Sequence, residues 1–351
     1  MSSSAPPRLV RALSLIAALI VTATACSAQP GPTGAAPAGD LSSVTLRVGA
    51  TGWATAQAAL RVAGLDSTPY RVQWAVFPGG DKQLQALQGG ALDLVESSEI
   101  PPIFAAAAGS PRFKVVAVQR ANTLQQEVVV GRSSTLTDIA GLRGKKVGYV
   151  RNTTAHYFLD RLLERAGLRW DDITAVPLSP NDGVTALNSG AIDALASYGN
   201  SIITVHQSGG RTIGDGKDIL SGNFPWSAST DALADPGRRA ASVDLLARIS
   251  QAYAVIRQGR LDAFARATAD ATHEPLAQAR DELAAEEAQR PTDVVPTSPA
   301  GIASEQAVAD TFAQLKVIPT ALDVGAFWSD EVNTELTAAL TKALSSPPPG
   351  R

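Results

Sequence analysis

Residues 77–104, FPGGDKQLQALQGGALDLVESSEIPPIF, combine a glycine turn, a helix, a buried strand and a loop in one run. Gly79 and Gly80 precede a segment with apolar residues at helical spacing, and a second glycine pair separates this helix from a short apolar strand. Ser97 and Ser98 follow that strand. Small hydroxyl residues at the carboxyl end of a strand lie where open α/β sheets bind ligands. The stretch therefore predicts one wall of a ligand site.

The same pattern occurs a second time in the chain. The octapeptide ALQGGALD at 86–93 returns as ALNSGAID at 186–193. Two further matches lie upstream in the same order: Val48-Gly49 with Val147-Gly148, and Ala63-Gly64-Leu65 with Ala166-Gly167-Leu168. Such self-similarity predicts two related βαβ units, each with a sheet buried under helices, rather than a solenoid. We expect an α/β protein of two lobes with a cleft between them, in which the repeated Asp93 and Asp193 are structural.

Composition restricts the function. The 351 residues are 45% hydrophobic and carry a formal charge of −3, which is enough chain for two modest lobes. Basic residues are scattered, so no nucleic-acid partner is expected. The single Cys and three His form no metal-ligand motif, and we expect neither a metal nor a cofactor.

The amino terminus predicts export. Arg8 and Arg11 precede the apolar run 12–21, which is short for a membrane span but suits a signal peptide over residues 1–25. Small residues then lead to Cys26, which resembles the lipidated first residue of a bacterial lipoprotein; the alternative is a secreted protein with an incidental Cys. Residues 26–43, rich in Pro, Gly and Ala, are expected to be a flexible tether.

Strand and helix patterns predict how the lobes are assembled. Residues 44–122 and 227–344 are assigned to lobe 1, residues 123–226 to lobe 2, and residues 345–351 to a frayed tail. Strand-like segments at Asn122–Gln126 and Asn223–Trp226 are expected to cross between the lobes as a hinge. From Asp235 onward the pattern is almost entirely helical, typical of helices that cover a lobe.

Candidate ligand residues lie at strand ends and helix starts in both lobes. In lobe 1, Trp53 follows the first strand, although such a Trp also packs against helices. The Gly79-Gly80 pair offers backbone amides at a helix start, although it also fits a plain turn. In lobe 2 we expect ligand contacts from the following residues: Asn152, Thr153, Thr154, His156, Tyr198 and Asn200. The first three also fit plain helix caps, and His156 is interpreted as a wall residue because no catalytic partner is adjacent to it.

Together the motifs FPGG, LQALQGGALDL, IPPIFAAAAG, LRGKKVGYVRNTTAHYFLDRLLERAGL and NSGAIDA, within residues 46–234, resemble the substrate-binding lipoproteins of ABC importers of the aliphatic-sulfonate, taurine and nitrate type. The resemblance implies a two-lobed, type II periplasmic-binding-protein fold. It also implies a monomer outside the cytoplasm, held at the cell membrane by its lipid, that closes on a small solute and docks on a membrane permease. The implied solute is an aliphatic sulfonate or a related anion, and no catalytic residue is expected.

One departure from that family bears on the solute. Where sulfonate binders commonly have Gly-x-Gly-Asp before Pro-Pro, this chain has Glu96-Ser-Ser-Glu99. A carboxylate in the pocket repels a sulfonate, so either Glu96 points away or the solute is not a simple anion. Two other functions stay open: an enzyme on the same fold that makes cofactor precursors, and a lipoprotein that senses a ligand.

Overall fold

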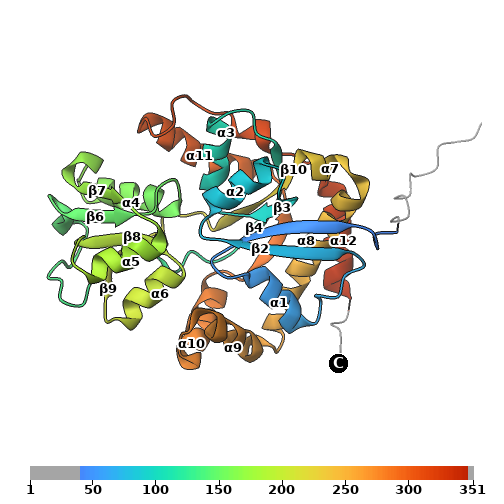
Figure 1. Ribbon diagram of the computed structural model, residues 1–351, viewed down its shortest axis with the longest axis horizontal. Coiled ribbons are helices and arrows are strands. Elements are labelled where there is room, and N and C mark those ends of the chain that lie inside the picture. Colours follow the sequence, from blue (N-terminus) through green and yellow to red (C-terminus); the bar gives the residue numbers. More distant parts are fainter. Residues whose placement is uncertain (1–39, 347–351) are drawn as a thin grey trace, which may run out of the picture. The chain divides into compact units, whose positions relative to one another are not determined.

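The computed structural model describes residues 40–346 (Figure 1). The predicted signal peptide, Cys26, residues 26–39 of the predicted tether and residues 347–351 lie outside the described residues. Within the described range, no helix is both long enough and apolar enough to cross a bilayer.

The first sheet has six strands in the order β11-β4-β10-β3-β1-β2. Its strands are β1 (Thr45–Thr51), β2 (Arg71–Phe77), β3 (Leu94–Glu96), β4 (Phe113–Arg120), β10 (Asn223–Ser229) and β11 (Asp293–Pro296). β1 pairs in parallel with both β2 and β3, whereas β10 runs antiparallel between β3 and β4. The edge strand β11 pairs antiparallel with β4.

The second sheet has five strands in the order β7-β6-β8-β5-β9 and lies on the left of Figure 1. Its strands are β5 (Gln126–Val130), β6 (Lys146–Tyr149), β7 (Thr174–Pro177), β8 (Ala194–Tyr198) and β9 (Arg211–Asp215). β6 pairs in parallel with β7 and β8, and β5 runs antiparallel to β8. The order β7-β6-β8-β5 therefore repeats the order β2-β1-β3-β10, as the internal repeat predicts.

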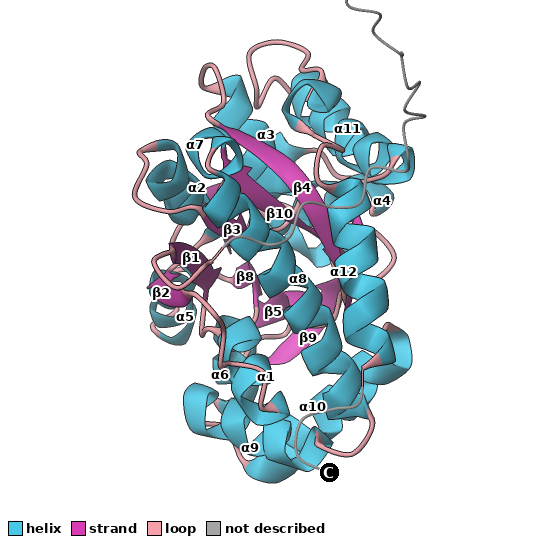
Figure 2. Cartoon of the chain, turned by 90° about the vertical axis from the view of Figure 1, so that its right-hand side faces the viewer, coloured by secondary structure: helices cyan, strands magenta, loops and turns pink. Residues whose placement is uncertain are grey.

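Twelve α-helices cover the two sheets within the described residues (Figure 2). They are α1 (Thr55–Ala63), α2 (Gly80–Gln88), α3 (Ile100–Ala107), α4 (Thr154–Arg165), α5 (Pro180–Asn188), α6 (Asn200–Gln207), α7 (Thr230–Ala234), α8 (Pro236–Arg257), α9 (Leu261–Thr272), α10 (Leu276–Gln289), α11 (Pro299–Gln314) and α12 (Asn333–Ser345). We call the elements around the first sheet lobe 1 and those around the second sheet lobe 2.

The repeated residues make the same contacts in each lobe. The Asp93 carboxylate accepts the Arg47 backbone N–H, and the Asp193 carboxylate accepts the Lys146 backbone N–H, both at 2.8 Å. Each Asp thereby ties the start of its strand to the neighbouring strand, which confirms the structural role predicted for the pair.

The repeated glycines are explained by close packing. A Cβ atom at Gly49 would lie 2.9 Å from Leu92 Cδ1, and one at Gly148 would lie 2.5 Å from Ile192 Cδ1. A larger residue at either position would therefore have to displace the end of that side chain, so the close packing favours glycine.

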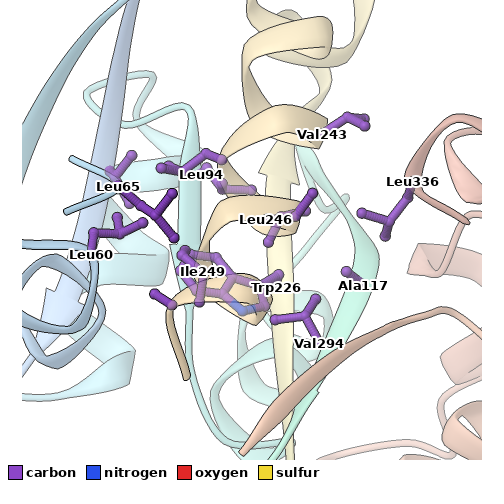
Figure 3. Close-up of a cluster of buried hydrophobic side chains, with 14 of the residues drawn as sticks. Leu60, Leu65, Leu94, Ala117, Trp226, Val243, Leu246, Ile249, Val294 and Leu336 are labelled. Atoms are coloured by element: carbon purple, nitrogen blue, oxygen red, sulfur yellow. The ribbon is translucent and has the colours of Figure 1, made fainter. Parts of the chain in front are cut away.

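Apolar clusters lie on both faces of each sheet. In lobe 1, Leu246 and Ile249 of the central helix α8 pack around Trp226 of β10, with Leu336 of α12 in the same cluster (Figure 3). The other face of that sheet packs on α2, α3 and α11. In lobe 2, the cluster that contains Phe158 of α4 covers one face and a smaller cluster covers the other. This layering buries strands that are apolar on both sides.

The chain passes between the sheets twice. Residues 121–125 connect β4 to β5, and residues 216–222 connect β9 to β10. The first connection overlaps the expected crossing at Asn122–Gln126. Asn223–Trp226, expected as the second crossing, instead lies within β10 because these residues pair with β4. The strand β11 also interrupts the stretch after Asp235 that was expected to be helical.

A candidate ligand-binding cavity

A cavity of about 520 Å³ lies between the carboxyl ends of strands in both sheets and extends beneath α9 and α10. Strand-end residues such as Ser97 and Tyr198 line it, as do Asn122 and Gln125 of the first crossing. A volume of this size fits a small organic solute. Because both lobes and a crossing form its wall, any movement of one lobe against the other changes its shape.

Eight of the eleven residues predicted to contact ligand line this one cavity. They are Trp53, Gly80, Ser97, Ser98, Thr153, Thr154, Tyr198 and Asn200. They come from five separate stretches of chain and from both lobes. Their convergence follows from the rule that ligands bind beyond the carboxyl ends of strands in open α/β sheets. Direct contact with a ligand stays a prediction for each of them.

The other three predicted residues lie outside the lining. Gly79 is directly behind it, since a Cβ atom there would be 3.7 Å from the Tyr198 hydroxyl. Asn152 has a left-handed backbone conformation, with φ of 59°, in the turn before α4. His156 is only 5% exposed and packs within 5.4 Å, between ring centroids, of the aromatic rings of Tyr149, Trp170 and Phe312.

The surroundings of His156 make it a packing residue. Burial, and to a lesser extent the positive charge of Arg151, lower its pKa to about 4, so the ring is neutral at physiological pH. Its position one turn into α4 directs it toward the aromatic core of lobe 2 and α11 instead of toward the cavity.

Four helices begin at the cavity without a hydrogen bond from the side chain of the N-cap residue. These helices are α1, α2, α4 and α6, and their first residues line the cavity. A fifth helix that begins at the cavity, α5, is capped by Ser179, and α8 and α11 are capped by Asp235 and Ser298. Amides at the start of a helix that are left without a side-chain acceptor favour acceptor oxygens or a negative charge on a ligand.

The hydroxyl groups near α4 are held in place by hydrogen bonds. Thr153 donates to the Val150 carbonyl at 2.7 Å instead of capping the helix, and Thr154 donates to Gln126 Oε1 at 2.6 Å. Burial, followed by the negative charge of Asp81, raises the pKa of Tyr198 to about 12, while a hydrogen bond with Thr153 opposes the increase. The phenol is therefore protonated and can donate a hydrogen bond.

Gly199 allows the chain to turn from β8 into α6 at the cavity. Its φ of 57° and ψ of −136° are accessible in practice only to glycine. This turn brings Tyr198, Gly199 and Asn200 to the cavity wall as consecutive residues.

With this geometry, comparison with known proteins decides the family. The family described as NMT1/THI5 like matches residues 75–279 of this chain, which is more than half of its length. The chain belongs to the NMT1/THI5-like family.

Proteins similar to this NMT1/THI5-like chain are named as binding proteins. An aliphatic sulfonates-binding protein of Escherichia coli K12 is 30% identical over 259 residues, covering 72% of this chain and 78% of the relative. The alkanesulfonate-binding protein SsuA from Xanthomonas axonopodis pv. citri, solved bound to MOPS, is 26% identical with a TM-score of 0.73, covering 84% of this chain and 99% of that one. The periplasmic aliphatic sulphonate binding protein SsuA from Escherichia coli is 27% identical with a TM-score of 0.70, covering 82% and 92%. The predicted family, two-lobed fold and solute-binding role are confirmed.

The same fold also occurs in an enzyme. The desulfurization enzyme DSZB has a TM-score of 0.58 at 16% identity, covering 85% of this chain and 99% of the enzyme, a likeness that concerns the fold alone. Within residues 40–346 of this NMT1/THI5-like protein, no group of three or more His, Cys, Asp or Glu residues is placed to hold a metal ion.

Acidic side chains line part of the cavity. Five glutamates line it: Glu96, Glu274, Glu282, Glu286 and Glu287. Among the lining residues of the described chain there is no Lys, Arg or His. Glu96 therefore faces the cavity, which excludes the alternative that it points away. Desolvation raises its pKa to about 7.

Glu99 has a different place. Its carboxylate accepts hydrogen bonds from Ser221 Oγ at 2.6 Å and from Asn223 Nδ2 at 3.1 Å, and it lines a second, smaller cavity of about 220 Å³. Of the two glutamates in the Glu96-Ser-Ser-Glu99 departure, only Glu96 reaches the main cavity.

Sequence reasoning missed the glutamates of α10 because that helix was assigned a covering role. The available signal was the spacing of Glu282 and Glu286, which puts both carboxylates on one face of a helix. The aromatic residues Tyr253 and Phe264, which also line the cavity, gave no signal, since their helices lie far along the chain from the repeat.

Proposed function

We propose that this protein is the extracytoplasmic solute-binding component of an ABC importer, which captures a small organic solute and delivers it to a membrane permease. The observation that carries the proposal is the main cavity, which equivalent strand ends of the two repeated lobes line together. The names of the sulfonate-binding relatives support the same function.

The solute in this proposal carries a sulfonate or a related acid group. The starts of α1, α2, α4 and α6 would hold that group with backbone amides, and Ser98 and Tyr198 would add hydroxyl donors. Charge-assisted hydrogen bonds of this kind are the stronger ones in proteins. The acid group is placed at these helix starts because the carboxylates of α10 would repel it.

A thermal-shift and calorimetric screen of the full-length chain tests this function. A bound alkanesulfonate at one hundred times its dissociation constant should stabilise the native state by about 2.7 kcal/mol. Ser98→Ala and Tyr198→Phe should each weaken binding by roughly 1 to 3 kcal/mol. The exposed Ser110→Ala is the matched control and should leave affinity unchanged. Equal affinity in all of these variants would refute the assignment of the acid-group site.

The proposed membrane attachment is through Cys26, with the protein acting as a monomer. Replacing Cys26 with Ala should release the protein from the membrane fraction and abolish lipid labelling. Unchanged retention and labelling of the Cys26→Ala protein would show that the chain is held in another way.

A further inference from the structure

A histidine of lobe 2 lies on the helix that approaches α10 of lobe 1. His206 is in the last turn of α6, and its Nε2 atom lies 2.8 Å from Oε2 of Glu127 on β5. The hydroxyl of Thr212, on β9, donates to the same carboxylate. These contacts fix the imidazole ring to two strands of its own lobe.

Glu127 favours a proton on the ring of His206. The hydrogen bond with Glu127 raises the pKa of His206 above its ordinary 6.5; desolvation opposes the increase, and the charges of Glu127 and Glu282 and a hydrogen bond with the backbone of Gly210 add to it. Although desolvation acts the other way, hydrogen bonds from His206 and Thr212 lower the pKa of Glu127. An imidazolium and a carboxylate therefore exist together at pH 6.5.

Glu282 belongs to the other lobe. Its Oε2 accepts a hydrogen bond from Gln125 Nε2 at 2.6 Å, and its Oε1 accepts one from Gln278 Nε2 at 2.8 Å. Burial raises the pKa of Glu282, and the positive charge of His206 acts against this increase. The charge of His206 thus acts on the opposite lobe, where α6 and α10 approach each other (Figure 1).

The other charged groups around His206 do not replace this attraction. Arg211 of β9 donates to the carbonyls of Ser134 and Leu136, and Arg132 packs against Gly209 in the turn after α6. On the side of lobe 1, the charged neighbours of Glu282 are acidic: Glu274 and Glu286. A protonated His206 therefore faces negative charge on lobe 1.

Closure of the main cavity brings these groups together. Asn200, Ser201 and Ile203 of α6 line the cavity from lobe 2, and Glu282 and Glu286 of α10 line it from lobe 1. A rotation of the lobes that closes the cavity on a solute therefore shortens the distance between His206 and Glu282. Because attraction between opposite charges grows as they approach, closure stabilises the protonated ring.

We propose that His206 is a pH-sensitive contact between the lobes, at which closure on a solute takes up a proton. The inference deepens the proposed function and rests on it for the closure. The closed protein binds this proton more tightly than the open protein does. The contribution to affinity is therefore fully present below the pKa of His206 in the open protein, and it is lost as the pH rises through the pKa in the closed protein.

Titration of the His206 ring by NMR tests the contact without any ligand. The signal is assigned by its loss in His206→Gln, and its pKa in the full-length protein should exceed 6.5. Glu282→Gln should lower that pKa by about 0.3 pH unit, since one opposite charge is removed. Asp281→Asn, an exposed change on the same helix, is the matched control and should leave the pKa unchanged. An unchanged pKa in Glu282→Gln would overturn the contact between the lobes.

Calorimetry with butanesulfonate measures the coupling of the proton to closure. Glu96 and Glu286 also titrate near pH 7, so the deciding quantity is the difference between the unaltered protein and His206→Gln. The ratio of affinities at pH 6 and pH 8 should be about threefold larger in the unaltered protein, which corresponds to a rise of about 0.5 pH unit in the pKa of His206 on closure. His273→Asn, a change of an exposed histidine, should retain the ratio of the unaltered protein.

The outcomes separate this inference from the proposed function. If butanesulfonate does not bind the folded protein, the sulfonate assignment fails, and the ligand-free titration still decides whether His206 contacts lobe 1. If it binds with the same pH profile in the unaltered protein and in His206→Gln, the proton-linked closure is overturned. An equal pKa of His206 with and without bound butanesulfonate would also overturn it, and that measurement uses the unaltered protein alone.

Discussion

Replacement of Glu286 by Gln should stabilise the ligand-free protein, and the gain should depend on pH. Burial and three neighbouring glutamates raise the pKa of this carboxyl from its ordinary 4.5 to about 7. At about 1.4 kcal/mol for each pH unit, ionisation in the folded state costs roughly 3 kcal/mol. The side chain is half-buried and retains some contact with solvent. We therefore expect a gain of about 1 to 3 kcal/mol in the free energy of unfolding at pH 8.

The sign follows from the order of the two pKa values. The folded pKa is the higher one, so below pH 4.5 the carboxyl is protonated in both states and the substitution changes little. Between pH 4.5 and 7 only the unfolded state loses its proton, and above pH 7 both states are ionised and the full penalty applies. The gain from Glu286→Gln should therefore rise from near zero at pH 4.5 to its maximum above pH 7.

Urea unfolding followed by circular dichroism at several values between pH 4.5 and pH 8 measures this difference. Asp281→Asn is the matched control and should give no pH-dependent gain, because its carboxylate is exposed. A constant gain across the pH range would show that packing, and not charge, is responsible. A loss of stability at pH 8 would contradict the electrostatic reasoning.

Two further predictions concern fold and hinge. Asp93→Ala should lower the free energy of unfolding by about 3 to 5 kcal/mol because Arg47 and Arg238 lose their buried partner. Asp193 is exposed, so Asp193→Ala should lower the free energy of unfolding by only about 1 kcal/mol. Equal losses in denaturant titrations of the two variants would disprove this difference. Saturating ligand should contract the protein in small-angle scattering, through rotation at residues 121–125 and 216–222; an unchanged radius with binding confirmed would indicate a rigid site.

Much of the sheet topology could be predicted because each copy of the internal repeat contains the residues that pack its own strands together. The repeated Gly and Asp act between neighbouring strands of one unit, so their roles can be inferred from the sequence of that unit alone. The second crossing was misplaced for an equally local reason. Pro225 lacks an N–H and argues against a central strand, yet it lies in β10 next to the register shift at Trp226 and accepts the Ser97 N–H at 3.1 Å through its carbonyl.

The cavity wall was predictable only where strand ends form it. Ser97 and Tyr198 follow buried strands, and the sheet then determines that they meet. No comparable rule relates the glutamates of α10 to the first lobe's strand ends, because the helix arrives there through tertiary packing more than 150 residues along the chain. The position of His156 near the start of α4 suggested a place in the cavity wall. Proximity to a helix start, however, does not determine which face of the helix meets the cavity.

The free helix amides and the glutamates that line the cavity make opposite electrostatic demands on a solute. A plain anion would accept hydrogen bonds from the free helix amides but would leave Glu96 and Glu286 without partners in a drier, closed cavity. A plain cation would neutralise those carboxylates but would leave the amides at the starts of α1, α2, α4 and α6 unsatisfied by a ligand. Desolvation raises the pKa of Glu96, and desolvation followed by the neighbouring glutamates raises that of Glu286, so protonation of these two carboxyls also removes their need for a positive partner. The free energy lost by keeping ionised, unpaired carboxylates in the empty protein is thus recovered either by their protonation or by a bound donor, which makes these glutamates a basis for selectivity as well as affinity.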